Sequence, residues 1–158
     1  MKLMKKYRFL LILVILFESV SYSIGMLTRP AGDGWYETLI KAPLTPPDWA
    51  FGVVWPLLYL CMAISVWLIW ENRNKPLSRF ALTFFAAHMI LNWSWNFVFF
   101  EFQMILAAFL LLICIAGMVG ILIPVFFRIH KAAGVLLIPY LLWVSFAVYL
   151  SGFIWVLN

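Results

Sequence analysis

Five long apolar stretches constrain the fold of this chain more than any other feature. Of its 158 residues, 66% are hydrophobic and 11% are charged, whereas a soluble domain is about half apolar and a quarter charged. A run of about 20 apolar residues crosses a bilayer as a helix, because lipid offers no partners for backbone N–H and C=O groups. We therefore predict an all-α integral membrane bundle of five transmembrane helices, formed by residues 1–158 as a single domain. The expected spans are about residues 7–28, 47–70, 78–100, 104–127 and 132–156.

The basic residues predict how the helices cross the membrane. Loops on the cytoplasmic side carry an excess of Lys and Arg. If the N-terminus lies inside, the outer turns hold two basic residues, Arg29 and Lys41, and four acidic ones, Asp33, Glu37, Asp48 and Glu101. The other nine basic residues then lie inside: Lys2, Lys5, Lys6, Arg8, Arg73, Lys75, Arg79, Arg128 and Lys131. This bias favours an odd number of spans, and it explains the net charge of +5 without a nucleic-acid surface.

The first apolar stretch has two interpretations. Its opening, MKLMKKYRFLLILVILFESVSYS, has the basic start and short apolar centre of a signal peptide. Apolar character resumes after Glu18, through Tyr22, Ile24 and Met26, which favours a first span. A carboxylate within a span is costly and often functional. Glu18 therefore has either a functional role or a structural one, in which it is protonated or bonded to Ser19, Ser21 or Tyr22 in a helix interface.

The loop from about Arg29 to Thr45 is too long for a minimal turn and is rich in aromatic residues. Because Trp35, Tyr36 and Leu39 favour cover over water, we predict that the loop folds back as a lid over the outer mouth of the bundle. An interfacial aromatic belt is the alternative. At the end of the loop we expect Thr45 to cap the next helix and Pro47 to take its first position.

Residue spacing places several aromatic and polar side chains on single helix faces. One face holds His88, Asn92, Trp95 and Phe99; a second holds Tyr140, Trp143, Ala147 and Ser151; a third holds Trp55, Tyr59 and Met62. If these faces meet, they enclose a cavity with aromatic walls that suits a flat, largely apolar ligand. Simple packing of the bundle is the alternative interpretation. No metal site is predicted, since Cys61, Cys114, His88 and His130 lie far from one another in the sequence.

Several motifs resemble the TspO family, the translocator or tryptophan-rich sensory proteins. The motif WYxxL starts at Trp35, and TPPDWxFGxVWxxLY runs from Thr45 to Tyr59. The residues from Asn92 to Trp95, with Phe99 and Phe100, resemble the family's LNxxWxxxFF, and the segment that starts at Pro139 resembles its PYLxWxxFA. The residues from Ile154 to Asn158 also fit. The chain departs from the family at three positions. Ala42 replaces a usual proline, His88 a usual glutamine, and Ser151 an expected asparagine.

The resemblance implies a membrane receptor for protoporphyrin IX and similar flat hydrophobic ligands, including synthetic benzodiazepine and isoquinoline types, with a sensory or regulatory role. It requires no cofactor and implies a homodimer, in a bacterial inner membrane or a mitochondrial one. Two other functions stay open: transport of porphyrin or sterol, and light- and oxygen-dependent porphyrin degradation, with Trp55 and Trp143 as photochemical candidates. The expected ligand-binding residues are Trp35, Tyr36, Pro46, Trp49, Phe51, Trp55, Tyr59, His88, Asn92, Trp95, Phe99, Tyr140, Trp143, Phe146 and Ala147.

Overall fold

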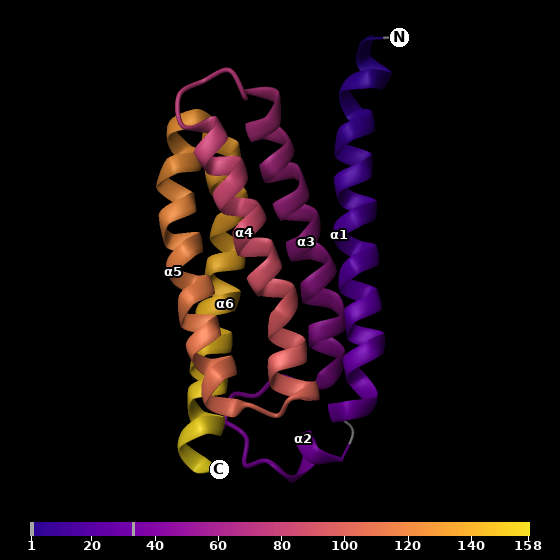
Figure 1. The fold of residues 1–158 in the computed structure, drawn as a ribbon, viewed down its shortest axis with the longest axis vertical. Helices are drawn as coiled ribbons and strands as arrows, with labels where there is room; N and C mark the ends of the chain where they lie inside the picture. Colours follow the sequence, from indigo (N-terminus) through magenta and orange to yellow (C-terminus); the bar gives the residue numbers. More distant parts are fainter. Residues whose placement is uncertain (1, 33) are drawn as a thin grey trace.

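The computed structural model describes the backbone of residues 2–32 and 34–158, and the side chains of residues 7–28 and 34–158. Within these residues, all regular structure is helical: α1 (Lys2–Gly32), α2 (Trp35–Thr38), α3 (Asp48–Glu71), α4 (Ser78–Asn96), a π-helical turn (Phe97–Glu101), α5 (Ile105–Ile129) and α6 (Lys131–Leu157). Five long helices stand side by side, and α2 lies at one end of them (Figure 1). Five side chains of the charge argument lie outside the described side chains: Lys2, Lys5, Lys6, Arg29 and Asp33.

The long helices follow one another around the bundle in an order that differs from the sequence. Helix α1 packs on α3, α3 on α6, α6 on α5 and α5 on α4, while α4 closes the ring against α1 and α3. We call the end that holds α2 and Asn158 the α2 end, and the end that holds the α3–α4 turn the opposite end (Figure 1). This order makes α3 and α6 neighbours, although the whole of α4 and α5 lies between them in the sequence.

Four of the described helices are long and apolar enough to cross a membrane: α1, α3, α5 and α6. Helix α4 has 19 residues, which is about 28 Å at 1.5 Å per residue. It is less apolar because it carries Ser78, His88 and Asn92, all three of which are buried inside the bundle. These three polar residues therefore face the other helices, as the spacing of His88 and Asn92 predicts. By contrast, Arg79 and Thr83 of the same helix are exposed.

The first turn of α6 packs closely against α5 and α3. Gly134 in the first turn of α6 lies so near the Phe127 ring that an added Cβ would stand 2.5 Å from it. The buried hydroxyl of Ser65 on α3 donates a 2.7 Å hydrogen bond to the Ala133 carbonyl. By contrast, a Cβ on Gly120 of α5 would meet nothing within 4 Å, so this glycine provides no close packing inside the bundle.

The start of α3 differs from the prediction. Thr45 does not cap the helix, because its hydroxyl donates to the Ala42 carbonyl at 2.8 Å and its backbone N–H bonds the same carbonyl at 3.0 Å. Pro47 takes the cap position with extended backbone, and α3 begins at Asp48. The threonine therefore closes a tight turn before the helix, and the helix end gains no side-chain cap.

Candidate functional site

A chain of buried hydrogen bonds joins three helices in the middle of the bundle. Nε2 of His88 on α4 lies 2.9 Å from the Tyr140 hydroxyl of α6. That hydroxyl donates to Oδ1 of Asn92 at 2.8 Å, and Nδ2 of Asn92 donates to the Tyr59 hydroxyl of α3 at 3.0 Å. All four side chains are buried. We call these residues the polar chain.

The polar chain defines the tautomer of His88. A phenol has one proton, and the Tyr140 proton is donated to Asn92. His88 must therefore carry its proton on Nε2 and donate it to the Tyr140 oxygen. The buried Nδ1 is then a bare acceptor, and it has no partner among the described residues. The donations all run in one direction, from His88 to Tyr59.

Aromatic rings extend from the polar chain toward the α2 end, along the contact between α3 and α6. Trp55 stacks on Tyr59 at 5.6 Å and meets the Tyr140 ring edge-on at 6.5 Å. One turn nearer the α2 end, Phe51 meets Trp143 at 5.7 Å. Trp143 in turn contacts Phe146 at 5.9 Å. We call Phe51, Trp55, Trp143 and Phe146 the α3–α6 seam; all four are only partly buried.

Prolines interrupt both helices beside this seam. Pro56 follows Trp55 inside α3, and Pro139 precedes Tyr140 inside α6. Each removes one backbone N–H from its helix and disfavours the regular turn that precedes it. Both helices continue through their proline, so each lacks one backbone hydrogen bond close to the point where their aromatic side chains meet.

A second aromatic group lies beneath α2. Trp35 and Tyr36 meet the buried Phe99 ring at 5.5 and 6.1 Å. Phe99 also stacks on Trp95 at 5.1 Å. The indole N–H of Trp95 donates to the Ala108 carbonyl of α5 at 3.1 Å, which directs this ring toward α5.

The predicted site residues therefore form two groups in place of one chamber. Phe51, Trp55, Trp143 and Phe146 form the seam, next to Tyr59, His88, Asn92 and Tyr140 of the polar chain, while Trp35, Tyr36, Trp95 and Phe99 gather beneath α2. Ala147 packs against the main apolar core, and Pro46 is partly buried. Trp49 stands apart, with 71% of its surface exposed.

Two residues at the α2 end make contacts that the sequence did not predict. Phe100 meets both Tyr36 and Trp95 edge-on. The amide of Asn158 bonds both backbone groups of Ile40. The motif around Phe99 included Phe100, so its spacing gave a signal. A side chain that bonds a backbone 118 residues away leaves no trace in local spacing.

A hollow of about 410 Å³ lies away from both groups, between α5 and α6 near the α2 end. Its lining is almost wholly apolar and includes Phe109, Gly152, Phe153 and Trp155. Phe109 and Trp155 stack within it at 5.5 Å. Tyr149 lines it as well as Trp155, but the lining exposes almost no polar surface, so the hollow offers a ligand few hydrogen-bonding partners. We therefore place the candidate site on the seam.

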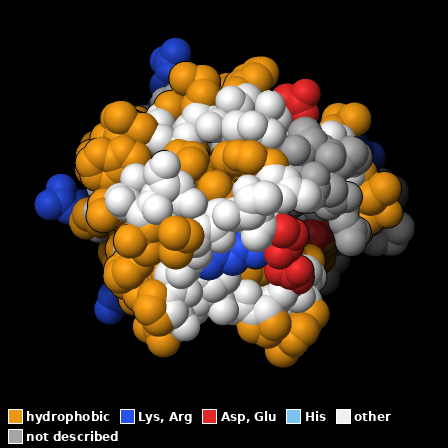
Figure 2. All heavy atoms as spheres, turned by 90° about the horizontal axis from the view of Figure 1, so that it is seen from below, with side chains coloured by type: hydrophobic (Ala, Val, Ile, Leu, Met, Phe, Trp, Pro, Cys, Tyr) orange, Lys and Arg blue, Asp and Glu red, His pale blue; other side chains and the backbone are white. Residues whose placement is uncertain are grey.

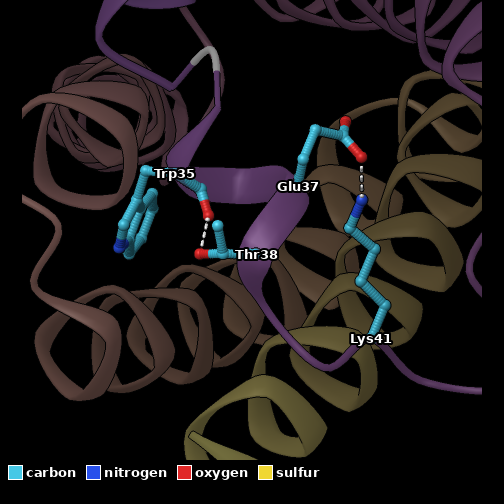
Figure 3. Close-up of polar contacts among 4 residues, drawn as sticks. All are labelled: Trp35, Glu37, Thr38 and Lys41. Atoms are coloured by element: carbon cyan, nitrogen blue, oxygen red, sulfur yellow. Dashed lines mark hydrogen bonds and ion pairs between the residues drawn. The ribbon is translucent and has the colours of Figure 1, made fainter.

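Polar contacts on the surface of the α2 segment are weaker than its apolar anchors. Lys41 lies 3.0 Å from a carboxylate oxygen of Glu37 and 4.2 Å from the centre of the Tyr36 ring, and Thr38 bonds the Trp35 carbonyl (Figure 3). An exposed pair at this spacing contributes about 0.3–0.5 kcal/mol, whereas burying one large apolar side chain contributes about 1.5–3 kcal/mol. Trp35 and Tyr36 therefore hold α2 in place more than the Glu37–Lys41 pair does.

The α2 end combines charge with apolar surface. Figure 2 looks onto this end and shows acidic and basic side chains together within a rim of hydrophobic ones. Burial raises the pKa of Tyr36, and the nearby Asp48 and Glu37 carboxylates raise it further. Its phenol therefore stays neutral at neutral pH, beneath the Lys41 ammonium.

These features define an integral membrane protein whose helices enclose a hydrogen-bonded polar chain with an aromatic seam beside it. The model of the TspO/MBR family matches residues 11–156. A tryptophan-rich protein TspO from Archaeoglobus fulgidus is 36% identical over 140 residues, covering 89% of this chain and 90% of that protein. The translocator protein of Ovis aries is 33% identical, covering 80% of this chain and 76% of that protein. A tryptophan-rich sensory protein from Cereibacter sphaeroides is 32% identical, covering 78% and 75%.

The chain belongs to the TspO/MBR family, since the family model matches nearly its whole length. Relatives that carry the names translocator protein and tryptophan-rich sensory protein both align with most of it. The resemblance seen in the sequence motifs is thereby confirmed.

We expect Tyr140→Phe to lower the free energy of unfolding by about 1–3 kcal/mol, because it leaves buried groups of His88 and Asn92 without a partner. Thermal unfolding of the purified protein in detergent measures the effect. Tyr149→Phe is the matched control, since that hydroxyl makes no hydrogen bond within the described part of the chain. Equal stability of the two variants would contradict a tightly bonded polar chain.

Proposed function

We propose that the protein is a membrane receptor for porphyrins such as protoporphyrin IX and for similar flat hydrophobic ligands. The α3–α6 seam is the observation that carries this proposal. Its four rings are partly buried, so a flat ligand can stack on Trp55 and Trp143 without displacing the fully buried core. Aromatic rings favour offset stacking and edge contacts with other rings.

The polar chain supports this site in two ways. Tyr59 and Tyr140 contact Trp55 through their rings, and Asn92 holds both hydroxyls. The indole therefore keeps its orientation before a ligand arrives, which lowers the entropic cost of binding. Most hydrogen-bonding groups of the polar chain are already bonded to one another. We therefore expect ring contacts, more than hydrogen bonds, to hold a ligand on the seam.

We propose further that α4 is a fifth span, and that the N-terminus faces the inner side of a bacterial cell membrane. Helix α4 lies alongside the four apolar helices over much of their length (Figure 1). Its buried polar residues meet α3 and α6 rather than lipid. In this orientation the loop between α1 and α3 lies outside and acts as a lid over the mouth of the seam.

Degradation of the porphyrin in light and oxygen is a second candidate function, favoured by the position of Trp55. An indole can donate an electron to an excited porphyrin, and the reduced porphyrin can pass this electron to molecular oxygen, which becomes superoxide. The oxidised indole stays on Trp55, which packs against Tyr59 and Tyr140, and the superoxide can then attack the porphyrin ring. The proposed binding site thus places an oxidisable aromatic group where the ligand would lie.

Titration with protoporphyrin IX in the dark tests binding. We expect saturable quenching of tryptophan emission, and we expect Trp55→Ala and Trp143→Ala each to weaken binding about tenfold or more, as the loss of one buried ring predicts. Trp70→Ala is the control, because Trp70 lies at the opposite end of α3, near Phe9 and Arg73. If all three variants bind like the unchanged protein, the ligand does not lie on the seam.

The same samples under illumination test degradation. We expect the absorbance of bound porphyrin to fall faster than that of free porphyrin in detergent, and Trp55→Phe to slow the fall while retaining a ring for binding. Equal rates for bound and free porphyrin would exclude a photochemical role.

Cysteine labelling tests the orientation. In a chain with Cys61 and Cys114 replaced by Ala, we expect a membrane-impermeant maleimide to label Leu44→Cys in intact cells, and Asn74→Cys only after the membrane is opened. Both positions are exposed in the fold, at opposite ends. Labelling of Asn74→Cys in intact cells would reverse the proposed orientation.

A further inference from the structure

The backbone between α2 and α3 passes the ends of α6 and α3 that flank the α3–α6 seam. Ile40 lies against Asn158, which follows the last residue of α6. Eight residues later the chain enters α3 at Asp48. Residues 40–47 therefore run from the end of α6 to the start of α3, across the α2 end of the contact between these two helices (Figure 1). We call residues 40–47 the cover segment.

The cover segment has little internal freedom. Thr45 bonds the Ala42 carbonyl through both its N–H and its hydroxyl. Pro43, Pro46 and Pro47 fix three of its φ angles. Ala42 is buried, whereas Leu44 has 66% of its surface exposed. Such a segment moves as one piece, about its attachments at the two ends.

The two attachments differ in kind. At one end the segment is covalently continuous with α3. At the other, Asn158 bonds both backbone groups of Ile40: the Ile40 N–H donates to Oδ1 at 2.9 Å, and Nδ2 donates to the Ile40 carbonyl at 3.1 Å. This amide reproduces the pairing that a neighbouring strand would give.

A third hydrogen bond fixes the orientation of the Asn158 amide. Nδ2 of Asn158 also donates to the Ile154 carbonyl, at 2.9 Å. Exchanging the amide oxygen and nitrogen would abolish all three bonds, so the contacts define one orientation. The side chain is thus positioned by α6 itself, whether or not the cover segment is docked.

The apolar anchors lie on the other side of Ile40. Trp35, Tyr36 and Leu39 pack with Phe99 and Ile154 before the chain reaches Ile40. They hold α2, whereas the segment that follows has weaker contacts: Lys41 forms an exposed pair with Glu37 and lies over the Tyr36 ring, and the small side chain of Ala42 is buried. Loss of the Asn158 bonds therefore loosens the cover segment more than it loosens α2.

We propose that Asn158 is a clasp that holds the cover segment closed over the α3–α6 seam, and that its release opens the seam at the α6 side. For its effect on ligand exchange the inference rests on the proposed function. The clasp itself is a property of the fold and is tested without ligand.

Hydrogen exchange of the purified protein, read by mass spectrometry, tests the clasp. Asn158→Asp keeps the shape and the acceptor but loses both N–H donations, and Asn158→Ala loses all three bonds. Asn158→Ala loses both bonds to Ile40, whereas Asn158→Asp loses one of them. We therefore expect exchange in peptides that cover residues 39–47 to rise roughly tenfold or more in the alanine variant, and by a smaller factor in the aspartate variant. Exchange in residues 34–38 and in the long helices stays the same.

Asn74→Ala is the matched control, because Asn74 is exposed in the turn at the opposite end and its side chain makes no hydrogen bond within the described residues. Unchanged exchange in residues 39–47 for both Asn158 variants overturns the clasp. A rise spread evenly over the chain also overturns it, since that result indicates general loss of stability.

Stopped-flow measurement of tryptophan quenching by protoporphyrin IX tests whether the clasp controls the rates of ligand binding and release. A clasp governs passage, so we expect Asn158→Ala to raise the association and dissociation rates together by about tenfold, with little change in Kd. If exchange rises as expected but no variant binds porphyrin, the clasp stands and the proposed function fails. If porphyrin binds and neither rate changes, the cover segment does not gate the seam.

Discussion

A polar group inside a bilayer must find its partner within the protein, and this requirement organises the bundle around the polar chain. His88 and Asn92 would be costly in lipid. They become compatible with a membrane only because Tyr140 and Tyr59 supply hydroxyls from two other helices. The rotation of α4, and its place against α3 and α6, follow from these bonds. The surrounding apolar contacts are numerous but less directional.

The polar chain also determines where the bundle is fully closed and where it is not. Around the chain, side chains such as Met62 and Tyr140 are buried completely. Toward the α2 end the contact between α3 and α6 changes to large rings that are partly exposed. The middle of the bundle is thus a closed core, whereas the α2 end presents partly exposed aromatic rings. The α2 segment lies at this end, with apolar contacts before Ile40 and a small polar contact at Ile40 itself.

Much of this arrangement could be predicted from the sequence, because helical spacing is a local property. The spacing of His88 and Asn92 placed both on one inward face, and Tyr59 with Met62 was expected on another; all four are buried. Prediction was weaker where distant segments decide the outcome. Trp95 was expected to face the shared cavity, but its N–H bonds α5, next to a π-helical turn that changes the regular spacing. Thr45 resembles a helix cap, and a nearer carbonyl takes its hydroxyl. The role of Asn158 depends wholly on tertiary contact.

The most direct test of the central claim is an experimental structure of the protein with protoporphyrin IX bound in a lipid bilayer. The account predicts a porphyrin plane against Trp55 and Trp143, between α3 and α6, with residues 40–47 across the mouth and the polar chain intact behind it. Porphyrin found instead in the apolar hollow beside Phe109 and Phe153, with the seam unoccupied, would contradict it.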